Sequence, residues 1–407
     1  IIKAVYSSSN GLEKRPKLRF PGFDEPYKQC RIGDIYAERS QRGASDMELL
    51  SVTMNDGVKP RSEIEGKDNS SEDKSNYKIV RKGDMVYNSM RMWQGANGIS
   101  PCDGIVSPAY TVLMPKQEIN NGYFAALFKS ANLINEFRKN SQGMTSDTWN
   151  LKYPQIETIK VQIPSVSEQD KVSELFGVLD ARIVAQAQLV ESLKKYKRGL
   201  LNAFFAEKSD YFLFSDASAL KIEEVCDVLS GKRIPKGETF CSHPTEYRYI
   251  TVSDMGEKYV CSDNLQYISE HTEKQISRYK VKGGDIIISV AGTLGKLNII
   301  TSDLGGVNLT ENCDRFTNFR GVGSEYLYYV LSSDLIQSQI ESSKTKNGQP
   351  KLALERIRNF TIPVPHQEIQ EQLVKVMISL DQYIASQLAI LDRYCKLRSG
   401  LLQQLFI

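Results

Sequence analysis

Two groups of residues in this sequence carry side chains suited to one kind of chemistry, hydrogen bonding to the bases and phosphates of nucleic acid. Arg can donate two hydrogen bonds to guanine, Asn or Gln can bond adenine in the same bidentate way, and Lys on a loop suits phosphates. The first group of candidate DNA-binding residues is Lys59, Arg61, Asn88, Arg91, Trp93, Gln94, Lys139 and Gln142. The second group is Lys232, Arg233, Lys236, Ser289, Thr293, Lys296, Lys344, Lys346, Asn347, Gln349 and Lys351.

For any single one of these residues, a solvated loop charge is the commoner explanation. The argument for binding rests on recurrence. The loops at 88–94 and 289–296 take matching places in the two halves of the chain, yet their sequences differ. Two similar scaffolds with different polar loops are what two readers of different short sequences would need.

The motifs of known catalysts are missing or incomplete in this sequence. Segment 291–297 resembles a phosphate-binding loop, but Val290 and Leu297 stand where that motif needs Gly and Ser or Thr. The adenine methyltransferase tetrapeptide (Asn or Asp, Pro, Pro, aromatic) does not occur, and there are only three histidines for general-base chemistry. We therefore expect a binding protein rather than an enzyme.

The seven cysteines are scattered and form no CxxC pair. This spacing favours neither a disulfide framework nor a metal site, and it fits a reducing, cytoplasmic compartment. No apolar run approaches 18 residues, and the first ten residues lack the pattern of a signal peptide. We expect no membrane span.

Composition bounds the class of protein. A length of 407 residues suggests two or three domains, and 41% hydrophobic with 25% charged residues is typical of globular chains. The 52 basic and 49 acidic residues leave a net charge of only +3. Nucleic-acid binding would therefore require the basic residues to be sorted onto one face.

The chain repeats itself with an offset of about 201 residues, which a chance similarity would not keep constant. The matching pairs are Gly83-Asp84 with Gly284-Asp285, Leu179-Asp180 with Leu380-Asp381, and Gly199-Leu200 with Gly400-Leu401. We interpret the sequence as two copies of one module, a mixed globular domain followed by a long helix.

Each half ends in a helical pattern whose apolar residues are spaced by three, four or seven. The first pattern runs from Ser167 to Phe205 without a proline, which corresponds to a helix of about 58 Å. Such a helix is too long for one small domain to cover, so we predict that the two helices pair antiparallel with pseudo-two-fold symmetry. Two unrelated helices, each packed on its own domain, are the alternative. The residues expected at the helix pair or its partners are Leu175, Leu179, Ile183, Leu193, Leu200, Val376, Leu380, Ile384, Leu391 and Leu401.

The predicted fold class is α+β, with two similar mixed α/β globular domains separated by two long antiparallel coiled-coil helices. Short β-rich runs such as 110–114 and 285–290 alternate with helical stretches near 123–139 and 324–342. The expected boundaries are 1–165 for the first globular domain (with 1–15 a candidate disordered segment), 166–207 for the first helix, 208–364 for the second domain and 365–407 for the second helix.

This arrangement resembles the specificity (S) subunit of type I restriction–modification systems. The resemblance rests on the opening segment 16–23, on the duplicated Gly-Asp strand motifs, and on the Ile-Pro exits at Ile163 and Ile362 that precede Glu/Gln-rich helix starts. It covers about residues 16–407. Segment 24–28 departs from the family, because relatives often carry a Trp-rich acidic piece there.

The resemblance implies that each globular domain is a target recognition domain, which reads one half of a bipartite, asymmetric double-stranded DNA site. The two helices would form the spacer and the docking platform for two methyltransferase (modification) subunits, and a restriction motor–nuclease subunit would join them. S-adenosylmethionine, ATP and Mg would belong to those partners. This chain would itself carry no catalytic residue, no metal and no cofactor.

Two other interpretations compete with this one. A two-domain coiled-coil scaffold that binds proteins and does not recognise DNA is mildly favoured by the net charge of +3. A fused methyltransferase–specificity enzyme is disfavoured by the chain length and the missing tetrapeptide. Salt-dependent binding to duplex DNA distinguishes recognition from scaffolding, because phosphate contacts release counterions.

Overall fold

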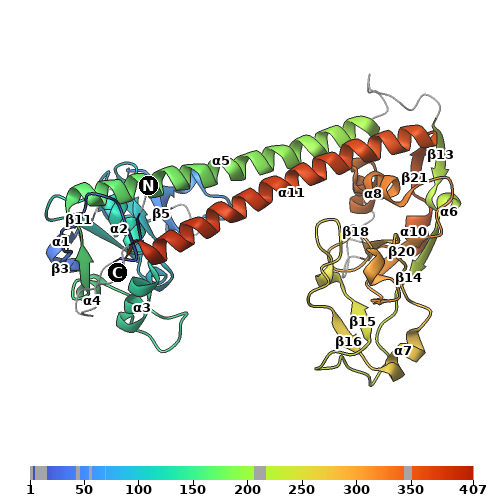
Figure 1. Ribbon diagram of the computed structural model, residues 1–407, viewed down its shortest axis with the longest axis horizontal. Helices are drawn as coiled ribbons and strands as arrows, with labels where there is room; N and C mark the ends of the chain where they lie inside the picture. Colours follow the sequence, from blue (N-terminus) through green and yellow to red (C-terminus); the bar gives the residue numbers. More distant parts are fainter. Residues whose placement is uncertain are drawn as a thin grey trace. The chain divides into compact units, whose positions relative to one another are not determined.

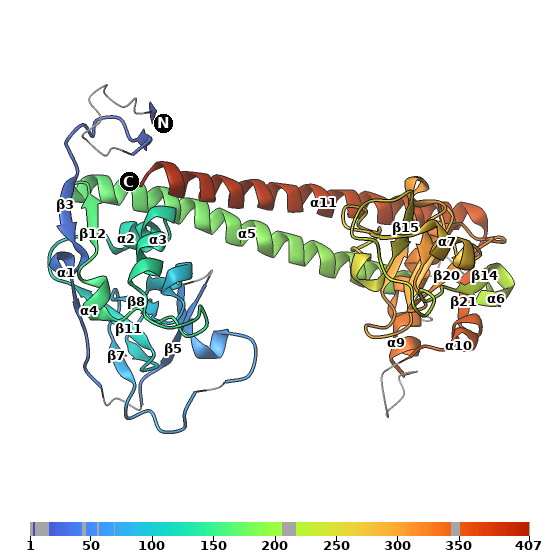
Figure 2. The same cartoon turned by 90° about the horizontal axis from the view of Figure 1, so that it is seen from below.

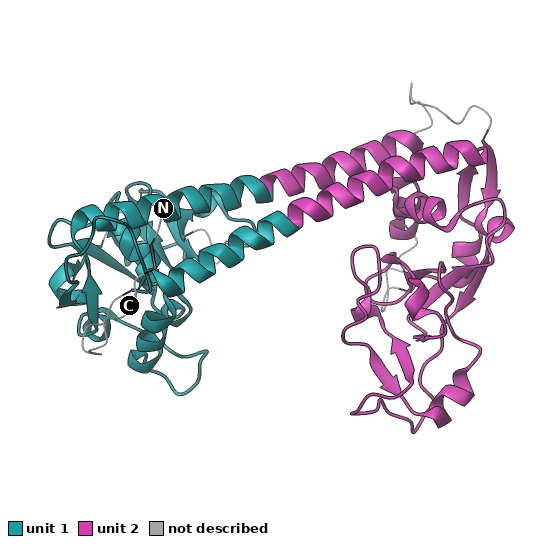
Figure 3. Ribbon diagram, viewed as in Figure 1, with its two compact units in different colours: residues 1–187, 389–407 teal, residues 188–388 magenta. Residues whose placement is uncertain are grey.

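The computed structural model describes residues 3–4, 16–42, 46–54, 57–68, 70–205, 217–342 and 351–406. The chain divides into two compact units, which Figure 3 colours separately. Unit 1 comprises residues 1–187 and 389–407, and unit 2 comprises residues 188–388. The boundary between the units falls near the middle of both long helices. The boundaries expected from the sequence give each helix a segment of its own, and they stay a prediction.

The globular part of unit 1 is built on two four-stranded sheets. One has the strand order β6-β5-β10-β7, in which β10 runs parallel to β5 and the other pairs are antiparallel. The other has the order β4-β11-β8-β9 and is antiparallel throughout. The bounds are β4 Tyr36–Glu38, β5 Leu49–Thr53, β6 Gly57–Pro60, β7 Lys78–Val80, β8 Met85–Asn88, β9 Asn97–Ile99, β10 Gly104–Val106 and β11 Tyr110–Pro115.

Short helices and two small strand pairs complete unit 1. Strand β12 (Lys160–Ile163) pairs with β3 (Lys28–Arg31) immediately before the first long helix, and β1 (Lys3–Ala4) pairs with β2 (Leu18–Arg19). The helices are α1 Ile32–Ile35, η1 Arg61–Glu63, η2 Met92–Gln94, α2 Asn121–Leu127, α3 Ala131–Asn140 and α4 Tyr153–Ile156.

Unit 2 repeats most of these strand pairings. Its sheets have the orders β14-β20-β17-β18 and β16-β15-β19, and β13 pairs with β21. The strands are β13 Ser218–Lys221, β14 Asp227–Ser230, β15 Tyr247–Ile250, β16 Gln266–Ile268, β17 Ile286–Ser289, β18 Leu297–Ile299, β19 Asn308–Leu309, β20 Cys313–Thr317 and β21 Thr361–Val364. The helices are α6 Ile222–Val225, η3 Val252–Asp254, α7 Glu270–Ile276, η4 Ser302–Leu304, α8 Ser324–Ser332, α9 Asp334–Ser342 and α10 Leu354–Arg358.

The predicted internal repeat is confirmed at the level of topology. The order β14-β20-β17-β18 is the counterpart of β4-β11-β8-β9, and the parallel pair β15–β19 is the counterpart of β5–β10. The repeated Gly-Asp motif has the same structure in both copies. Gly83 and Gly284 have φ of 91° and 86°, a left-handed conformation that favours glycine. The carboxylates of Asp84 and Asp285 each accept a hydrogen bond from the backbone three residues earlier.

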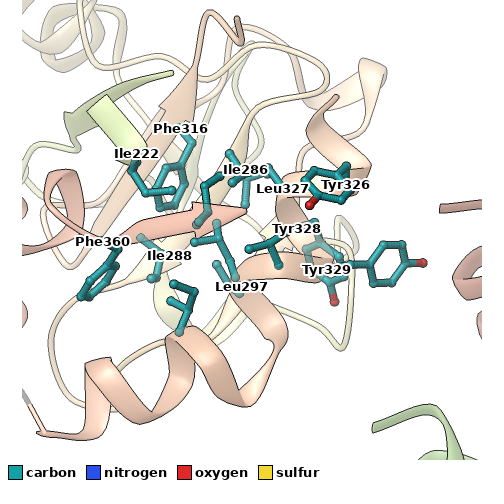
Figure 4. Close-up of a cluster of buried hydrophobic side chains, with 14 of the residues drawn as sticks. Ile222, Ile286, Ile288, Leu297, Phe316, Tyr326, Leu327, Tyr328, Tyr329 and Phe360 are labelled. Carbon is teal, nitrogen blue, oxygen red and sulfur yellow. The ribbon is translucent and has the colours of Figure 1, made fainter. Parts of the chain in front are cut away.

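Alternate side chains of the central strands enter different cores, because successive residues of a strand point to opposite faces. Ile286 and Ile288 of β17 join the cluster that includes Phe316 and Tyr326, whereas Ile287 joins a second cluster between the sheets of unit 2. Figure 4 shows the first of these clusters. Strand β8 repeats the pattern, with Met85 and Tyr87 in one cluster and Val86 in another. Both strands are therefore buried on both faces.

The two long helices are α5 (Val166–Phe205) and α11 (Gln367–Gln404). Their first turns are fixed in the same way by a buried glutamine. The Gln169 amide donates to the Pro164 carbonyl (3.0 Å) and its oxygen accepts from the Asn120 backbone (3.0 Å). Gln370, its counterpart 201 residues on, donates to the Pro365 carbonyl at 3.0 Å.

Within each unit, half of α5 lies antiparallel to half of α11, and the ribbons run side by side in both views (Figures 1 and 2). In unit 1, Phe176 stacks on Phe406 (5.8 Å between centroids), and Asp180 pairs with Arg398. In unit 2, Asp381 pairs with Lys197. The two ion pairs are equivalent under the 201-residue offset, so the predicted antiparallel, pseudo-symmetric helix pair is confirmed.

The residues expected at the helix pair or its partners differ in burial. Leu179 and Ile384 are buried, whereas Leu175, Ile183, Leu193, Leu200, Leu380, Leu391 and Leu401 are partly buried. Val376 is 43% exposed, so it lies outside the buried seam and stays a prediction as a partner contact. The buried residues at this level are Phe176 and Met377, which the spacing did not select. They are buried because the first turns of each helix also pack on a globular domain, which widens the covered face.

The two equivalent aspartates allow a matched test of the helix pair. Asp381 also accepts a hydrogen bond from the Tyr329 hydroxyl (2.6 Å) and lies 3.4 Å from the Lys258 ammonium, whereas the side chain of Asp180 is 48% exposed. We expect Asp381→Asn to lower the free energy of unfolding by about 1–3 kcal/mol, because it leaves buried donors unpaired. Asp180→Asn should cost less than about 1 kcal/mol. Urea unfolding followed by circular dichroism measures both, and equal losses would contradict this account.

Candidate nucleic-acid interface

The loop that leaves strand β8 carries four of the predicted binding residues of the first half. The strand ends at Asn88, and the chain turns through η2, which is fixed by the fully buried Met92 and closed by Gly95 at a φ of 87°. This turn leaves Arg91 and Gln94 exposed and Trp93 partly exposed. Local packing therefore presents the polar side chains outward and uses the apolar one as an anchor.

The second loop of the first half, which follows α3, is joined to this turn. The backbone amide of Leu151 donates to the carbonyl of Ser89 at 2.8 Å. Trp149 meets Trp93 edge to face, with 5.2 Å between ring centroids, and the guanidinium of Arg138 lies 5.6 Å from the Trp93 centroid. These contacts bring segments some fifty residues apart into one surface, which we call the first loop cluster: Asn88, Arg91, Trp93, Gln94, Arg138, Gln142 and Trp149.

Three side chains of the first loop cluster have unused hydrogen-bonding capacity. Arg91, Gln94 and Gln142 are exposed, and their side chains make no hydrogen bond or ion pair among the residues that the structure describes. Asn88, by contrast, accepts from the Met90 backbone at 3.0 Å. The predicted Lys139 lies in the last turn of the neighbouring helix α3. It pairs with Glu136 at 2.7 Å, and both side chains are exposed.

Lys59 and Arg61 lie elsewhere, on and just after β6 of the other sheet. The structure gives Arg61 a role different from the predicted one. Its guanidinium donates to three backbone carbonyls of its own loop, those of Ile64 (2.6 Å), Gly66 (2.9 Å) and Lys67 (2.8 Å). These bonds hold the loop together, and a DNA contact of Arg61 stays a prediction.

In the second half, three predicted residues follow β14. Lys232 and Lys236 are exposed, and the Lys232 ammonium lies 5.8 Å from the ring centroid of Tyr279. Arg233 is 79% exposed and donates to Glu311 at 2.5 Å. An ion pair this exposed is only marginally stable in water, so the guanidinium can exchange its carboxylate for a phosphate.

The 289–296 loop takes the place of the 88–94 loop. Thr293 and Lys296 are exposed, but Ser289 is fully buried. The Ser289 hydroxyl donates to the carbonyl of Thr293 and accepts a hydrogen bond from the amide of Lys296. Ser289 therefore shapes the loop and does not reach its surface, and the Lys296 ammonium is held by the Met255 carbonyl. The exposed Lys351 forms an isolated backbone β-bridge with Ala291. The next residue, Leu352, donates to the Val290 carbonyl at 2.9 Å, as Leu151 donates to Ser89 in the first half. Lys344, Lys346, Asn347 and Gln349 lie outside the described residues.

One carboxyl of unit 2, that of Asp314 near Lys351, has an unusual pKa. Burial in strand β20 raises the pKa of Asp314 to about 6, although a hydrogen bond from Ser230 and the charges of Lys351 and Arg358 oppose the rise. Because this pKa is above the value of the unfolded chain, folding favours the protonated acid. The carboxyl therefore costs stability progressively as the pH rises from about 4 to about 6, and nearby cations reduce that cost.

Arg138 and Trp149 belong to the first loop cluster but were not among the predicted residues. One signal for Trp149 was present, because the chain has only two tryptophans and both fall in loops of the same half. Arg138 gave no such signal, since it sits among ordinary helix charges and only the fold brings it to Trp93.

No helix among the described residues is long and apolar enough to cross a membrane. The same residues contain no group of three or more His, Cys, Asp or Glu side chains arranged to hold a metal ion.

Comparison with known proteins identifies the fold. The family described as "Type I restriction modification DNA specificity domain" matches residues 25–195 and again 215–392. The "Type I restriction enzyme MjaVIII specificity subunit" of Methanocaldococcus jannaschii is 24% identical over 324 residues, 75% of this chain and 74% of that protein. The EcoBI specificity subunit of Escherichia coli is 22% identical over 55% of this chain and 52% of its own length.

Two solved structures share the fold. The S subunit of a type I restriction–modification system from M. genitalium has a TM-score of 0.56 at 16% identity, covering 97% of this chain and 99% of that one. A chain from a study of complex assembly and conformational transition of the type I R-M system has a TM-score of 0.63 at 15% identity, covering 94% and 97%.

A duplicated α/β module, each copy followed by a long helix and each carrying its own polar loops, defines the class as a two-domain recognition protein. The chain belongs to the type I restriction–modification DNA specificity family and contains two copies of its domain. Its part in such a system is recognition of a DNA sequence rather than catalysis.

Variants of two arginines in unit 1 distinguish a predicted DNA contact from a structural role. We expect Arg91→Ala to weaken binding to the recognised duplex by about tenfold, since a good bidentate base contact contributes about 1–3 kcal/mol. Arg61→Ala should leave the affinity within about twofold and instead lower thermal stability. Fluorescence anisotropy with a labelled duplex and a parallel thermal melt measure both effects. A larger loss of affinity for Arg61→Ala than for Arg91→Ala would contradict the assignment.

Proposed function

We propose that this chain is the non-catalytic subunit that reads a bipartite, asymmetric duplex DNA site, with one half-site read by each globular domain. Each domain then acts as a target recognition domain. The observation that carries the proposal is the duplication of one strand topology with unlike loops at equivalent places, at 88–94 and 289–296. The first loop cluster supplies base-reading groups with unused donors, and the second half supplies Lys232, Arg233, Lys236 and Lys351 for phosphates.

The long helices are proposed as the spacer and as the docking platform for two methyltransferase subunits. Several large apolar side chains on them are exposed: Val178, Val184, Leu189, Tyr196, Val376, Tyr383 and Leu397. Tyr196 (60% exposed) and Leu397 (52% exposed) are equivalent under the 201-residue offset. Equivalent apolar contacts on a pseudo-symmetric pair suit two copies of one partner.

The proposed assembly also includes a restriction motor–nuclease subunit. S-adenosylmethionine, ATP and Mg would be bound by the partner subunits, and methylation would fall on adenine. Because the substrate would be the cell's own DNA, the proposed location is the cytoplasm.

The adenine methylome of host cells, with and without this gene and with the partner genes present, tests the proposal. We expect a two-part adenine-methylation motif with a fixed gap to disappear on deletion, because no other subunit would supply the sequence recognition. An unchanged methylome, together with DNA binding by the purified complex that does not weaken as salt rises, would contradict the proposal and favour a protein-binding scaffold.

A further inference from the structure

The loop between α3 and Leu151 is a hairpin closed by a single β-bridge, which we call the ribbon, rather than an irregular connection. Gln142 and Asn150 exchange two backbone hydrogen bonds, of 3.0 and 2.8 Å. A turn closes the ribbon, in which the Thr148 amide donates to the Thr145 carbonyl at 2.9 Å and the Thr148 hydroxyl accepts from the Thr145 amide at 3.1 Å. The loop therefore has a defined shape before any ligand arrives.

Gly143 is required by this shape. Its φ of 143° is one that side chains rarely adopt, and an added Cβ would lie 2.6 Å from the Thr148 carbonyl oxygen. On the returning side, next to the bridge residue Asn150, Trp149 is held against Trp93. The base of the ribbon is thus fixed on both sides, one by close backbone approach and the other by the aromatic pair.

The ribbon carries Met144 with a fully exposed side chain, at 101% of the reference area. A methionine in this position contributes nothing to the core of unit 1, so the fold does not account for it. Its loop neighbours in the first loop cluster are polar: Gln142 is two residues away, and Arg91 and Gln94 lie on the turn joined to the ribbon through Trp93. The unpaired donors of Arg91, Gln94 and Gln142 beside the apolar Met144 are complementary to a surface that offers hydrogen-bond acceptors and a few isolated apolar groups.

The edges of bases in the major groove of DNA form such a surface. That groove admits a two-stranded β-ribbon and so has room for a narrow hairpin, and the 5-methyl group of thymine is the apolar group that its base edges present. The thioether of methionine is flexible and polarizable and packs well against a methyl group. A protein surface would also offer acceptors and apolar groups, but residues 25–195 match a DNA specificity domain, which favours DNA as the occupant.

We propose that Met144 packs against the 5-methyl group of a thymine in the half-site that unit 1 reads, and so selects one A·T pair there. This inference rests on the proposed function. It assigns a sequence-determining side chain that is neither charged nor a hydrogen-bonding group.

Uracil replacement tests the contact, because deoxyuridine differs from thymidine only by that methyl group. The complex with its methyltransferase subunits is bound to duplexes that carry the methylome-defined motif, with each thymine replaced by deoxyuridine one at a time. At one position we expect the replacement to weaken the wild-type complex about fourfold, the equivalent of one buried methyl group. Met144→Ala should lose the same factor on the thymine duplex and show no response to uracil at that position.

Two variants control the experiment. Met144→Leu keeps an apolar side chain and should retain most of the response to uracil. Met54→Ala removes a methionine that is 39% exposed at the end of β5 and should bind both duplexes as the wild type does.

Three results would overturn the inference while leaving the proposed function intact. They are a wild-type complex that responds to uracil at no position, a Met144→Ala complex that still responds as the wild type does, and a loss of affinity in Met144→Ala that is equal on every duplex. The last would indicate a protein or backbone contact. Absence of any two-part motif would instead contradict the proposed function itself.

Discussion

A helix of 40 residues is stable in water only when another surface covers its apolar side, and this requirement organises the whole chain. Neither globular part is large enough to cover a helix of about 60 Å. The second copy of the module supplies the missing partner, so that each compact unit holds half of both helices. The equivalent ion pairs Asp180–Arg398 and Lys197–Asp381 fix the register at matching places. Duplication therefore supplies each long helix with the second helix that covers its apolar side.

The two copies differ where the globular part meets the helices. In unit 2, the Lys258 ammonium contacts Asp381, Glu325 and the Tyr329 hydroxyl, tying the domain to α11. In unit 1 the position equivalent to Lys258 is Gly57, which borders a hollow of about 240 Å³ beside Asp180 and Arg398. A shared scaffold thus tolerates different contacts at its base as well as different loops at its surface. This freedom is what the proposed reading of two different half-sites requires.

The long helices, their pairing and the repeat could be predicted from the sequence, because a 3.5-residue apolar period and a constant offset are local or one-dimensional signals. Spacing alone selected the exposed Val376, because it does not show that Met377 is buried against a domain as well as a helix. Charge and loop position selected Arg91, which is exposed as expected. They also selected Arg61, whose guanidinium donates hydrogen bonds to backbone carbonyls of its own loop. Arg138 and Met144 were missed because their surroundings are created by folding. Which loop residues contact DNA stays a prediction.

We propose that the helix pair sets the distance between two independently read half-sites. Duplicating residues 181–187 and 382–388 together adds seven residues to each helix at equivalent places and keeps the phase of the seam. The added length is about 10 Å, which corresponds to about three base pairs of B-DNA. The adenine methylome of cells expressing this variant should show the same two half-site sequences with a gap longer by about that number. Altered half-site sequences, or an unchanged gap, would contradict the account.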